Sequence, residues 1–237
     1  MKPLIRIKII LLLFFPVLNP AYAQDAERRQ MIDNSAIEYM RIAGSQAVLF
    51  YGIEQMGHPR VLNHPFLVDE QYTQGRLSFN GIIYPEVMLR LDLNRDELVI
   101  LSPDFRHIVL SPENVDFAEL HGRRIIYFHH NNLPGSPPTG YYSLLHSGKT
   151  KVLKRQTADL AVDQHRREQY FRFSTRIFLY KDGVYHTIRN RRGLLRVLYP
   201  YRRELRQFIS ANRLRFRHNA EGFITQVVRE YEKRSGL

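Results

Sequence analysis

The sequence predicts an α+β fold that is mainly β: an antiparallel β-meander, curved or partly closed, with an N-terminal helix and two to three C-terminal helices. Three observations support this prediction. Apolar residues recur at helical spacing over residues 25–44, alternate with polar residues from Arg76 to Ile188, and return to helical spacing after residue 190. Turn signals rich in Gly, Pro, Asn and Asp separate the alternating runs at intervals of about eight to twelve residues, which is typical of antiparallel β-proteins.

The N-terminal helix is expected over residues 25–44, with one face formed by Ile32, Ala36, Tyr39, Met40 and Ala43. Residues 57–74 show no period and contain two His-Pro pairs, and the residue before each proline favours extended backbone. We therefore expect this stretch to be a loop that connects the first helix to the sheet.

The clearest strand signals lie between residues 76 and 101. Asn80-Gly81 is the strongest short hairpin signal in the chain, and it follows the alternating run that contains Leu77. Four apolar residues then alternate with polar neighbours, which predicts a strand with one buried face: Val87, Leu89, Leu91 and Leu93. The paired carboxylates at the following turn are expected to be solvated: Asp92, Asp96 and Glu97.

Further strands are expected at residues 98–101, 107–110, 115–120, 124–129, 141–146 and 151–155, and a last hairpin at 171–180 and 184–188. Helices are expected at residues 194–198, 201–214 and 220–234. The chain thus divides into a signal peptide (1–23), an N-terminal helix with a proline-containing loop (24–75), the β-meander (76–190) and a basic helical tail packed on the sheet (191–237).

The first residues have the order of a secretory signal peptide. Lys2, Arg6 and Lys8 precede an apolar run over residues 9–18, and the small-residue site Ala21-Tyr22-Ala23 follows. The run is shorter than the roughly 20 residues that cross a bilayer. We expect cleavage before Gln24, no transmembrane span in the mature chain, and a location in the periplasm or at the periphery of the outer membrane.

The composition narrows the class of protein. The 237-residue chain is 44% apolar, which fits a folded globular protein. It contains no cysteine, which excludes disulfides, thiol nucleophiles, cysteine-ligated zinc and a cysteine-linked lipid anchor. We find no catalytic or cofactor-binding motif in the sequence, so we predict no catalytic residues, no cofactor and no metal ligands.

The charge of +12 is distributed unevenly. Residues 24–148 hold 10 basic and 15 acidic residues, a net charge of −5, whereas residues 149–237 hold 22 basic and 8 acidic residues, a net charge of +14. Such asymmetry predicts a basic surface with an acidic partner: an acidic envelope protein, a lipid head group or a polysaccharide. Export out of the cytoplasm argues against nucleic acid.

Arginines near the C-terminal helices are the candidate anion-binding or partner-binding residues: Arg189, Arg191, Arg192, Arg202, Arg206, Arg213, Arg215 and Arg217. On a helical wheel Arg202, Arg206 and Arg213 fall in one narrow stripe. Like charges four residues apart cost a few tenths of a kcal/mol, and a bound anion would offset this cost. The alternative is that these arginines pair with the acidic first half of the same molecule.

Three functional hypotheses follow. The first is a non-enzymatic envelope protein that docks an acidic partner or anionic surface through its basic C-terminal region. The second is an extracytoplasmic hydrolase or metal-dependent enzyme whose site is built from the loops near His58, His64 and His129, because loops on rigid sheets commonly carry chemistry. The third is a structural accessory of an outer-membrane assembly.

A series of short turn and strand signatures occurs in a fixed order along most of the mature chain. In this order, the sequence resembles a family of exported, β-rich proteins of Gram-negative bacteria that has no established activity. The resemblance implies a signal peptide, a β-rich body and a helical tail, and it implies no catalytic residue. The matching pieces are Tyr51-Gly52, His64-Pro65-Phe66, Phe79-Asn80-Gly81-Ile82-Ile83-Tyr84, Leu91-Asp92, Asp96-Glu97-Leu98-Val99, Gly140-Tyr141-Tyr142, Tyr180-Lys181-Asp182-Gly183 and Glu204-Leu205-Arg206-Gln207-Phe208-Ile209.

Overall fold

The computed structural model describes residues 20–44, 47–59 and 61–236. The charged and apolar parts of the predicted signal peptide, residues 2–18, lie outside the described residues. Helix α1 (Pro20–Ala43) begins before the predicted cleavage site, so residues 21–23 have helical backbone in the full chain. No helix in the described part of the chain is long and apolar enough to cross a bilayer.

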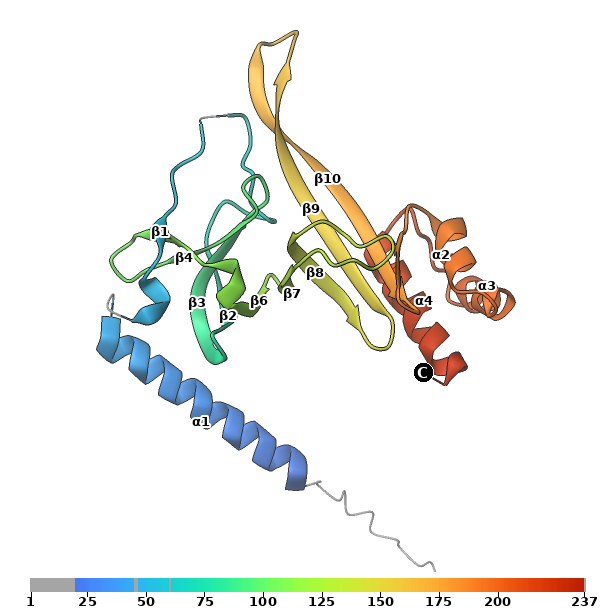
Figure 1. Ribbon diagram of the computed structural model, residues 1–237, viewed down its shortest axis with the longest axis horizontal. Helices are drawn as coiled ribbons and strands as arrows, with labels where there is room; N and C mark the ends of the chain where they lie inside the picture. Colours follow the sequence, from blue (N-terminus) through green and yellow to red (C-terminus); the bar gives the residue numbers. More distant parts are fainter. Residues whose placement is uncertain (1–19, 45–46, 60, 237) are drawn as a thin grey trace, which may run out of the picture.

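Within the described residues, eleven strands form one antiparallel sheet in the order β1-β5-β4-β3-β2-β6-β7-β8-β9-β10-β11. The fold class predicted from the sequence, α+β and mainly β with helices at both ends, is therefore confirmed (Figure 1). The sheet is open, and β1 and β11 are its edges. The strands are β1 (Ile53–Glu54), β2 (Thr73–Phe79), β3 (Ile82–Asp92), β4 (Glu97–Leu101), β5 (His107–Val109), β6 (Val115–Leu120), β7 (Arg123–Phe128), β8 (Gly140–Ser147), β9 (Lys151–Asp163), β10 (Glu168–Lys181) and β11 (Val184–Thr187).

The hairpin between β2 and β3 turns at Asn80-Gly81, as predicted. Both residues have positive φ, 53° and 75°, which a two-residue type I′ turn requires and which Asn and Gly tolerate. This turn sets the register at the start of β3, and the register shifts between Gly75 and Leu77 of β2. Beyond this shift Val87, Leu89 and Leu91 of β3 are buried and Met88 is exposed.

The first of two main cores lies on the buried face of β3 and its neighbouring strands. It contains Leu77, Leu89, Ile100, Ala118 and Ile125, all fully buried. Helix α1 packs along β3, and Met40 and Ala43 contact this core from the helix (Figure 1). Short 3₁₀ turns at Val48–Phe50 and Pro112–Asn114 complete this part of the molecule.

The second core lies between the other end of the sheet and the three C-terminal helices, α2 (Arg191–Val197), α3 (Arg202–Ala211) and α4 (Ala220–Ser235). Val152 of β9 and Leu179 of β10 pack there against Leu194, Leu205 and Val227 of the helices. Figure 1 shows these helices in orange and red beside β9 and β10. The apolar stripes of the helices are buried on the sheet, so their charged sides face outward.

Strands β9 and β10 form the longest hairpin of the sheet, which projects beyond the neighbouring strands (Figure 1). β9 continues eight residues past the predicted end at residue 155, because residues 156–163 pair with residues 168–175 of β10. Asn63 lies against the free edge of this hairpin and hydrogen-bonds the backbone of Phe171.

Candidate functional site

The eight candidate arginines are all exposed on the helical part of the molecule. No carboxylate of a described residue lies within 4.0 Å of any of their guanidinium groups, and they form no hydrogen bond with one. The alternative that they pair with the acidic first half of the chain is therefore not what the structure shows. They are Arg189 before α2, Arg191 and Arg192 in α2, Arg202 and Arg206 in α3, and Arg213, Arg215 and Arg217 between α3 and α4.

The carboxylates of α4 are engaged elsewhere. Glu221 pairs with Lys154 of β9, Glu232 accepts a hydrogen bond from His146 of β8 at 2.8 Å, and Glu230 pairs with Arg234 of the same helix. Two of these three acids thus attach α4 to the sheet. The remaining acid of the helical part is Glu204 of α3, and no ion pair joins it to the eight arginines among the described residues.

Four of the eight arginines surround one shallow hollow of about 410 Å³ between α2 and α3. Its lining residues are Arg191, Arg192, Leu195, Arg202 and Arg206. Arg202 and Arg206 are one helical turn apart on the outward side of α3, whose inward side buries Leu205 and Ile209. The hollow is therefore bordered by four exposed arginine side chains.

The start of α2 fixes two of these arginines. The Oδ1 atom of Asn190 accepts a hydrogen bond from the backbone N–H of Gly193 at 2.8 Å, which caps the helix. Leu194 is fully buried and holds the other side of the helix in the second core. Arg191 and Arg192 consequently lie at a defined position beside α3.

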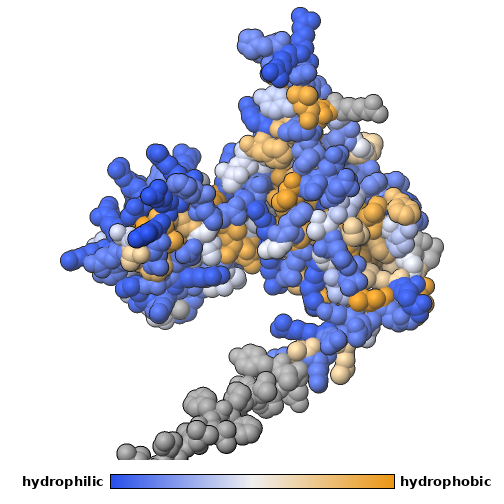
Figure 2. All heavy atoms as spheres, turned by 180° about the vertical axis from the view of Figure 1, so that it is seen from behind, coloured by the Kyte–Doolittle hydropathy of each residue, from blue (hydrophilic) through white to orange (hydrophobic). Residues whose placement is uncertain are grey.

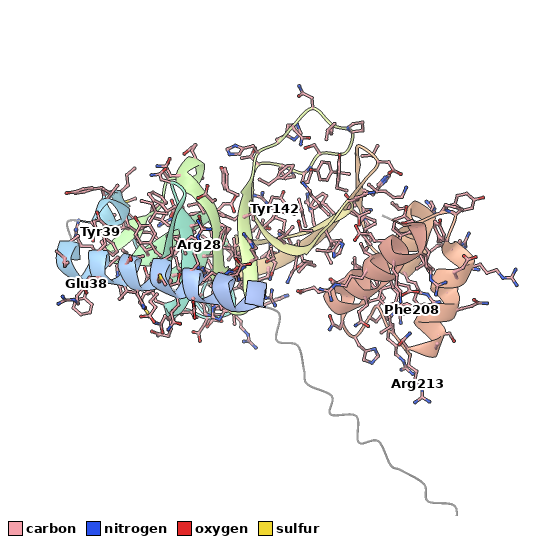
Figure 3. All side chains as sticks on the ribbon, turned by 90° about the horizontal axis from the view of Figure 1, so that it is seen from below. Arg28, Glu38, Tyr39, Tyr142, Phe208 and Arg213 are labelled. Carbon is pink, nitrogen blue, oxygen red and sulfur yellow. The ribbon has the colours of Figure 1, made fainter. Side chains whose placement is uncertain are left out.

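Arg213 does not share a helical stripe with Arg202 and Arg206. Helix α3 ends at Ala211, and Arg213 has a φ of 51°, so the predicted helix over residues 201–214 is too long and the wheel position of Arg213 does not apply. Figure 3 shows Arg213 at the outer end of the helical part, with its side chain directed away from the sheet. Arg215 and Arg217 follow in the same connection, outside the lining of the hollow.

The surface of the helical part is predominantly hydrophilic. In Figure 2, which views the molecule from behind, this part lies on the left and is covered mostly by blue residues. Orange patches are more prominent on the rest of that face.

A second group of polar side chains lines a cleft of about 710 Å³ beside the proline-containing loop. The structure brings His58 and His64 together in this cleft, and His107 of β5 joins them. His129 is not part of it; its ring lies edge-on to Tyr127 at a centroid distance of 5.0 Å. His107 was not among the predicted site residues, because its approach to the loop depends on the pairing of β5 with β4 and β1, which no local pattern encodes.

Asp92 lies behind the lining of this cleft, in contact with the lining residues His58 and Gln55. Its side chain is fully buried and accepts hydrogen bonds from His58 Nε2, from Gln55 Nε2 at 2.9 Å, and from the backbone N–H groups of Asn94 at 2.9 Å and Arg95 at 3.0 Å. The expected solvated turn is therefore wrong for Asp92. The segment before β2 folds over the strand face that the alternation predicted to be wet.

No three His, Cys, Asp or Glu side chains of the described residues are arranged to hold a metal ion. Comparisons of the chain with family models, with curated proteins and with solved structures find no match. What the protein does is therefore inferred from its own residues.

Proposed function

We propose that the protein is exported and docks onto an anionic, phosphate-bearing surface of the cell envelope through its arginine face. This face is defined as eight exposed arginines: Arg189, Arg191, Arg192, Arg202, Arg206, Arg213, Arg215 and Arg217. One observation supports this proposal above all. The eight guanidinium groups have no carboxylate partner among the described residues, and four of them surround one hollow. Since like charges held together repel, an external anion is the natural partner.

Phospholipid head groups match this arrangement. A guanidinium group donates two parallel hydrogen bonds to a phosphate, so the four groups of the hollow offer several bidentate contacts at once. The remaining arginines extend the positive surface beyond the hollow, which suits an array of phosphates better than a single ion. Each arginine near an anionic membrane contributes about 1 kcal/mol. The four arginines of the hollow would contribute about 4 kcal/mol, or roughly 10³-fold in affinity.

Export is the second part of the proposal. The basic leader, the apolar run over residues 9–18 and the Ala21-Tyr22-Ala23 site support it, and the absence of cysteine is compatible with an oxidising compartment. Fractionation of cells that express the full chain tests it. We expect a mature form beginning at Gln24 in the periplasmic or outer-membrane fraction. An uncleaved protein confined to the cytoplasm would contradict export.

Vesicle co-sedimentation tests the docking. The chain from Gln24 onward is mixed with phosphatidylcholine vesicles with and without 30% phosphatidylglycerol, a composition chosen for the assay, at increasing salt. We expect retention only on the anionic vesicles, with a loss as salt screens the charges. A variant with Arg191, Arg192, Arg202 and Arg206 all changed to Gln is expected to bind about 10³-fold more weakly.

A matched variant removes the same charge from the β9–β10 hairpin, where Arg166, Arg167, Arg172 and Arg176 are also exposed. This control is expected to retain most of its binding, because its charges lie outside the arginine face. Equal losses in the two variants would show that net charge alone attracts the protein. Equal retention of wild type and the hollow variant would reject the docking role.

A further inference from the structure

The cleft beside the proline-containing loop is organised around the ring of Phe66. The guanidinium carbon of Arg90 lies 3.9 Å from the centroid of this ring, His64 stacks on it at 6.0 Å, and His58 meets it edge-on at 5.7 Å. Phe66 is buried, and its backbone forms a bridge to Asp92 at the end of β3. Three groups capable of polar chemistry are therefore held around one fixed ring and line the same cleft.

The tautomer of His58 follows from its hydrogen bond. Its Nε2 contacts the buried carboxylate of Asp92, which can only accept, so Nε2 carries the proton of the neutral ring. Nδ1 forms no hydrogen bond with any described residue and remains an acceptor. The ring is fixed further by edge contacts with Phe66 and Phe171. His58 is thus an oriented imidazole base with its partner carboxylate shielded from water.

The neighbouring groups are donors. His64 Nδ1 accepts the backbone N–H of Phe66 at 3.3 Å, so its Nε2 carries the proton. The terminal nitrogens of Arg90 donate to the backbone oxygen of Glu70 at 3.0 Å and to Gln55 Oε1 at 3.3 Å. Each terminal nitrogen of Arg90 has a second N–H, so two further donors remain there, whereas Nε is buried without a partner among the described residues. The cleft combines one base with two donors, the set that acyl-transfer chemistry uses.

We propose that this cleft hydrolyses small carboxylic esters, with His58 as general base and with Arg90 and His64 as donors to the oxyanion. His58 Nδ1 takes a proton from a water molecule while the water oxygen bonds to the ester carbonyl carbon. The negative charge that develops on the carbonyl oxygen accepts N–H groups of Arg90 and His64. The intermediate then breaks its bond to the alcohol oxygen, which takes the proton back from Nδ1. The products are one carboxylic acid and one alcohol.

Asp92 is a positioning residue in this scheme. It fixes the tautomer of His58 and stabilises the imidazolium that forms when Nδ1 takes the proton. Gln55 links this pair to the donor side, because it donates to Asp92 at 2.9 Å and accepts from Arg90 at 3.3 Å. The base and Arg90 are consequently held by one hydrogen-bonded chain, whereas His64 is held by the backbone N–H of Phe66. The site shares no residue with the arginine face.

The test measures hydrolysis of p-nitrophenyl acetate, butyrate and octanoate by the chain from Gln24 onward. We expect turnover above the buffer rate, a loss of about 10²-fold or more in His58→Gln, and a loss of about 10²-fold in His64→Phe, which keeps a ring against Phe66. His129→Gln is the matched control, because His129 lies outside the cleft, and it is expected to keep the full rate.

Asp92→Asn tests whether Asp92 positions the His58 ring for catalysis or only stabilises the fold. The amide presents a donor to Nε2 and forces the proton onto Nδ1, so kcat is expected to fall while KM stays unchanged. A wild-type rate equal to buffer for all three esters overturns the proposal. So does a folded His58→Gln that retains the rate; if this variant does not fold, full activity of His64→Phe overturns it instead.

Discussion

Glu232 of α4 accepts two hydrogen bonds from Thr150, one from its backbone N–H at 2.8 Å and one from its hydroxyl at 2.5 Å. His146 of β8 approaches the other carboxylate oxygen at 2.8 Å. These contacts attach the last helix to the β8–β9 turn across 82 residues of sequence. The close approach also explains Gly148, where a Cβ would lie 2.5 Å from a Glu232 oxygen.

The hydrogen bonds of Glu232 to Thr150 and His146 are expected to stabilise the fold only at pH values where the Glu232 carboxylate is ionised. Burial raises the pKa of Glu232, but the hydrogen bonds from Thr150 and His146 together lower it by more. The net result is a pKa below the ordinary value of 4.5. A lowered folded-state pKa adds stability above the unfolded-state pKa, and this stability is lost as pH falls through the folded-state pKa. Glu232→Gln is expected to cost about 1–2 kcal/mol at pH 7 and to cost much less at pH 3 by urea unfolding.

Glu230→Gln on the same helix is the control for Glu232. Glu230 pairs with Arg234, whose side chain is 41% exposed, so its loss is expected to stay within about 0.5 kcal/mol at both pH values. If Glu232→Gln costs the same at pH 3 as at pH 7, the ionised form is not what stabilises the link.

Lys154 and Glu221 are expected to respond unequally to substitution. Lys154 is 5% exposed, and burial lowers its pKa even though Glu221 acts in the opposite direction. A buried ion pair is often replaceable by apolar groups, whereas removal of one partner leaves an uncompensated charge. Lys154→Met is therefore expected to change the free energy of unfolding by less than about 1 kcal/mol, and Glu221→Gln to lower it by about 2 kcal/mol, since Glu221 is partly exposed.

The pH dependence of Lys154 has the same sign as that of Glu232 but falls in the alkaline range. Because its pKa is lower in the folded state than the ordinary 10.5, folding becomes more favourable as pH rises through the interval between the two values. Urea unfolding of wild type and Lys154→Met between pH 7 and pH 10 measures this. A wild-type curve that does not rise relative to the variant would contradict the assignment.

Local sequence patterns predicted the strands and their turns, but they did not predict which distant residues pack over the strand faces. Asn80-Gly81 and the alternation along β3 placed the hairpin correctly, because turn chemistry and period depend on neighbours in sequence. The same alternation assigned Asp92 to a wet face. Gln55 and His58 cover it from 37 and 34 residues away, and no local period encodes that contact.

In the candidate sites, too, the sequence predicted which residues are involved but not how they are arranged in space. The charge asymmetry of the sequence pointed to the arginines, and all eight are exposed. Which four share a hollow depends on how α2 and α3 pack, and the end of α3 at Ala211 removed Arg213 from the predicted stripe. On α1, Ile32 and Tyr39 belong to the predicted apolar face, yet they are 45% and 44% exposed, because only part of that face reaches the sheet.

Gly140 at the start of β8 is expected to tolerate no side chain. Its φ is +144°, and a Cβ would overlap Asp96 Oδ2 and Arg155 Nη1. The other terminal nitrogen of Arg155, Nη2, forms an ion pair with Asp96 Oδ2 at 3.1 Å. Gly140→Ala combines backbone strain with the loss of this pair, so we expect a cost of about 3 kcal/mol or more in thermal or urea unfolding. Gly81→Ala, also at positive φ but with nothing within 4 Å, is expected to cost about 1 kcal/mol. Equal costs of the two substitutions would show that backbone strain at positive φ, and not the contacts with Asp96 and Arg155, determines the loss of stability.

Asn63 is expected to protect one amide at the free edge of the long hairpin. Its Oδ1 accepts the backbone N–H of Phe171 at 2.7 Å, and its Nδ2 donates to the backbone oxygen of Phe171 at 2.8 Å. Asn63→Ala removes both bonds, so hydrogen exchange at the Phe171 amide is expected to accelerate about fivefold or more, as the loss of about 1 kcal/mol implies.

Asn63→Asp separates the two bonds between Asn63 and Phe171. The carboxylate still accepts the Phe171 N–H, but it repels the Phe171 carbonyl oxygen that Nδ2 contacted. We therefore expect this variant to keep much of the amide protection while losing more global stability than Asn63→Ala. Exchange followed by NMR together with urea unfolding measures both quantities. Unchanged exchange in Asn63→Ala would mean that the edge of β10 is closed without Asn63.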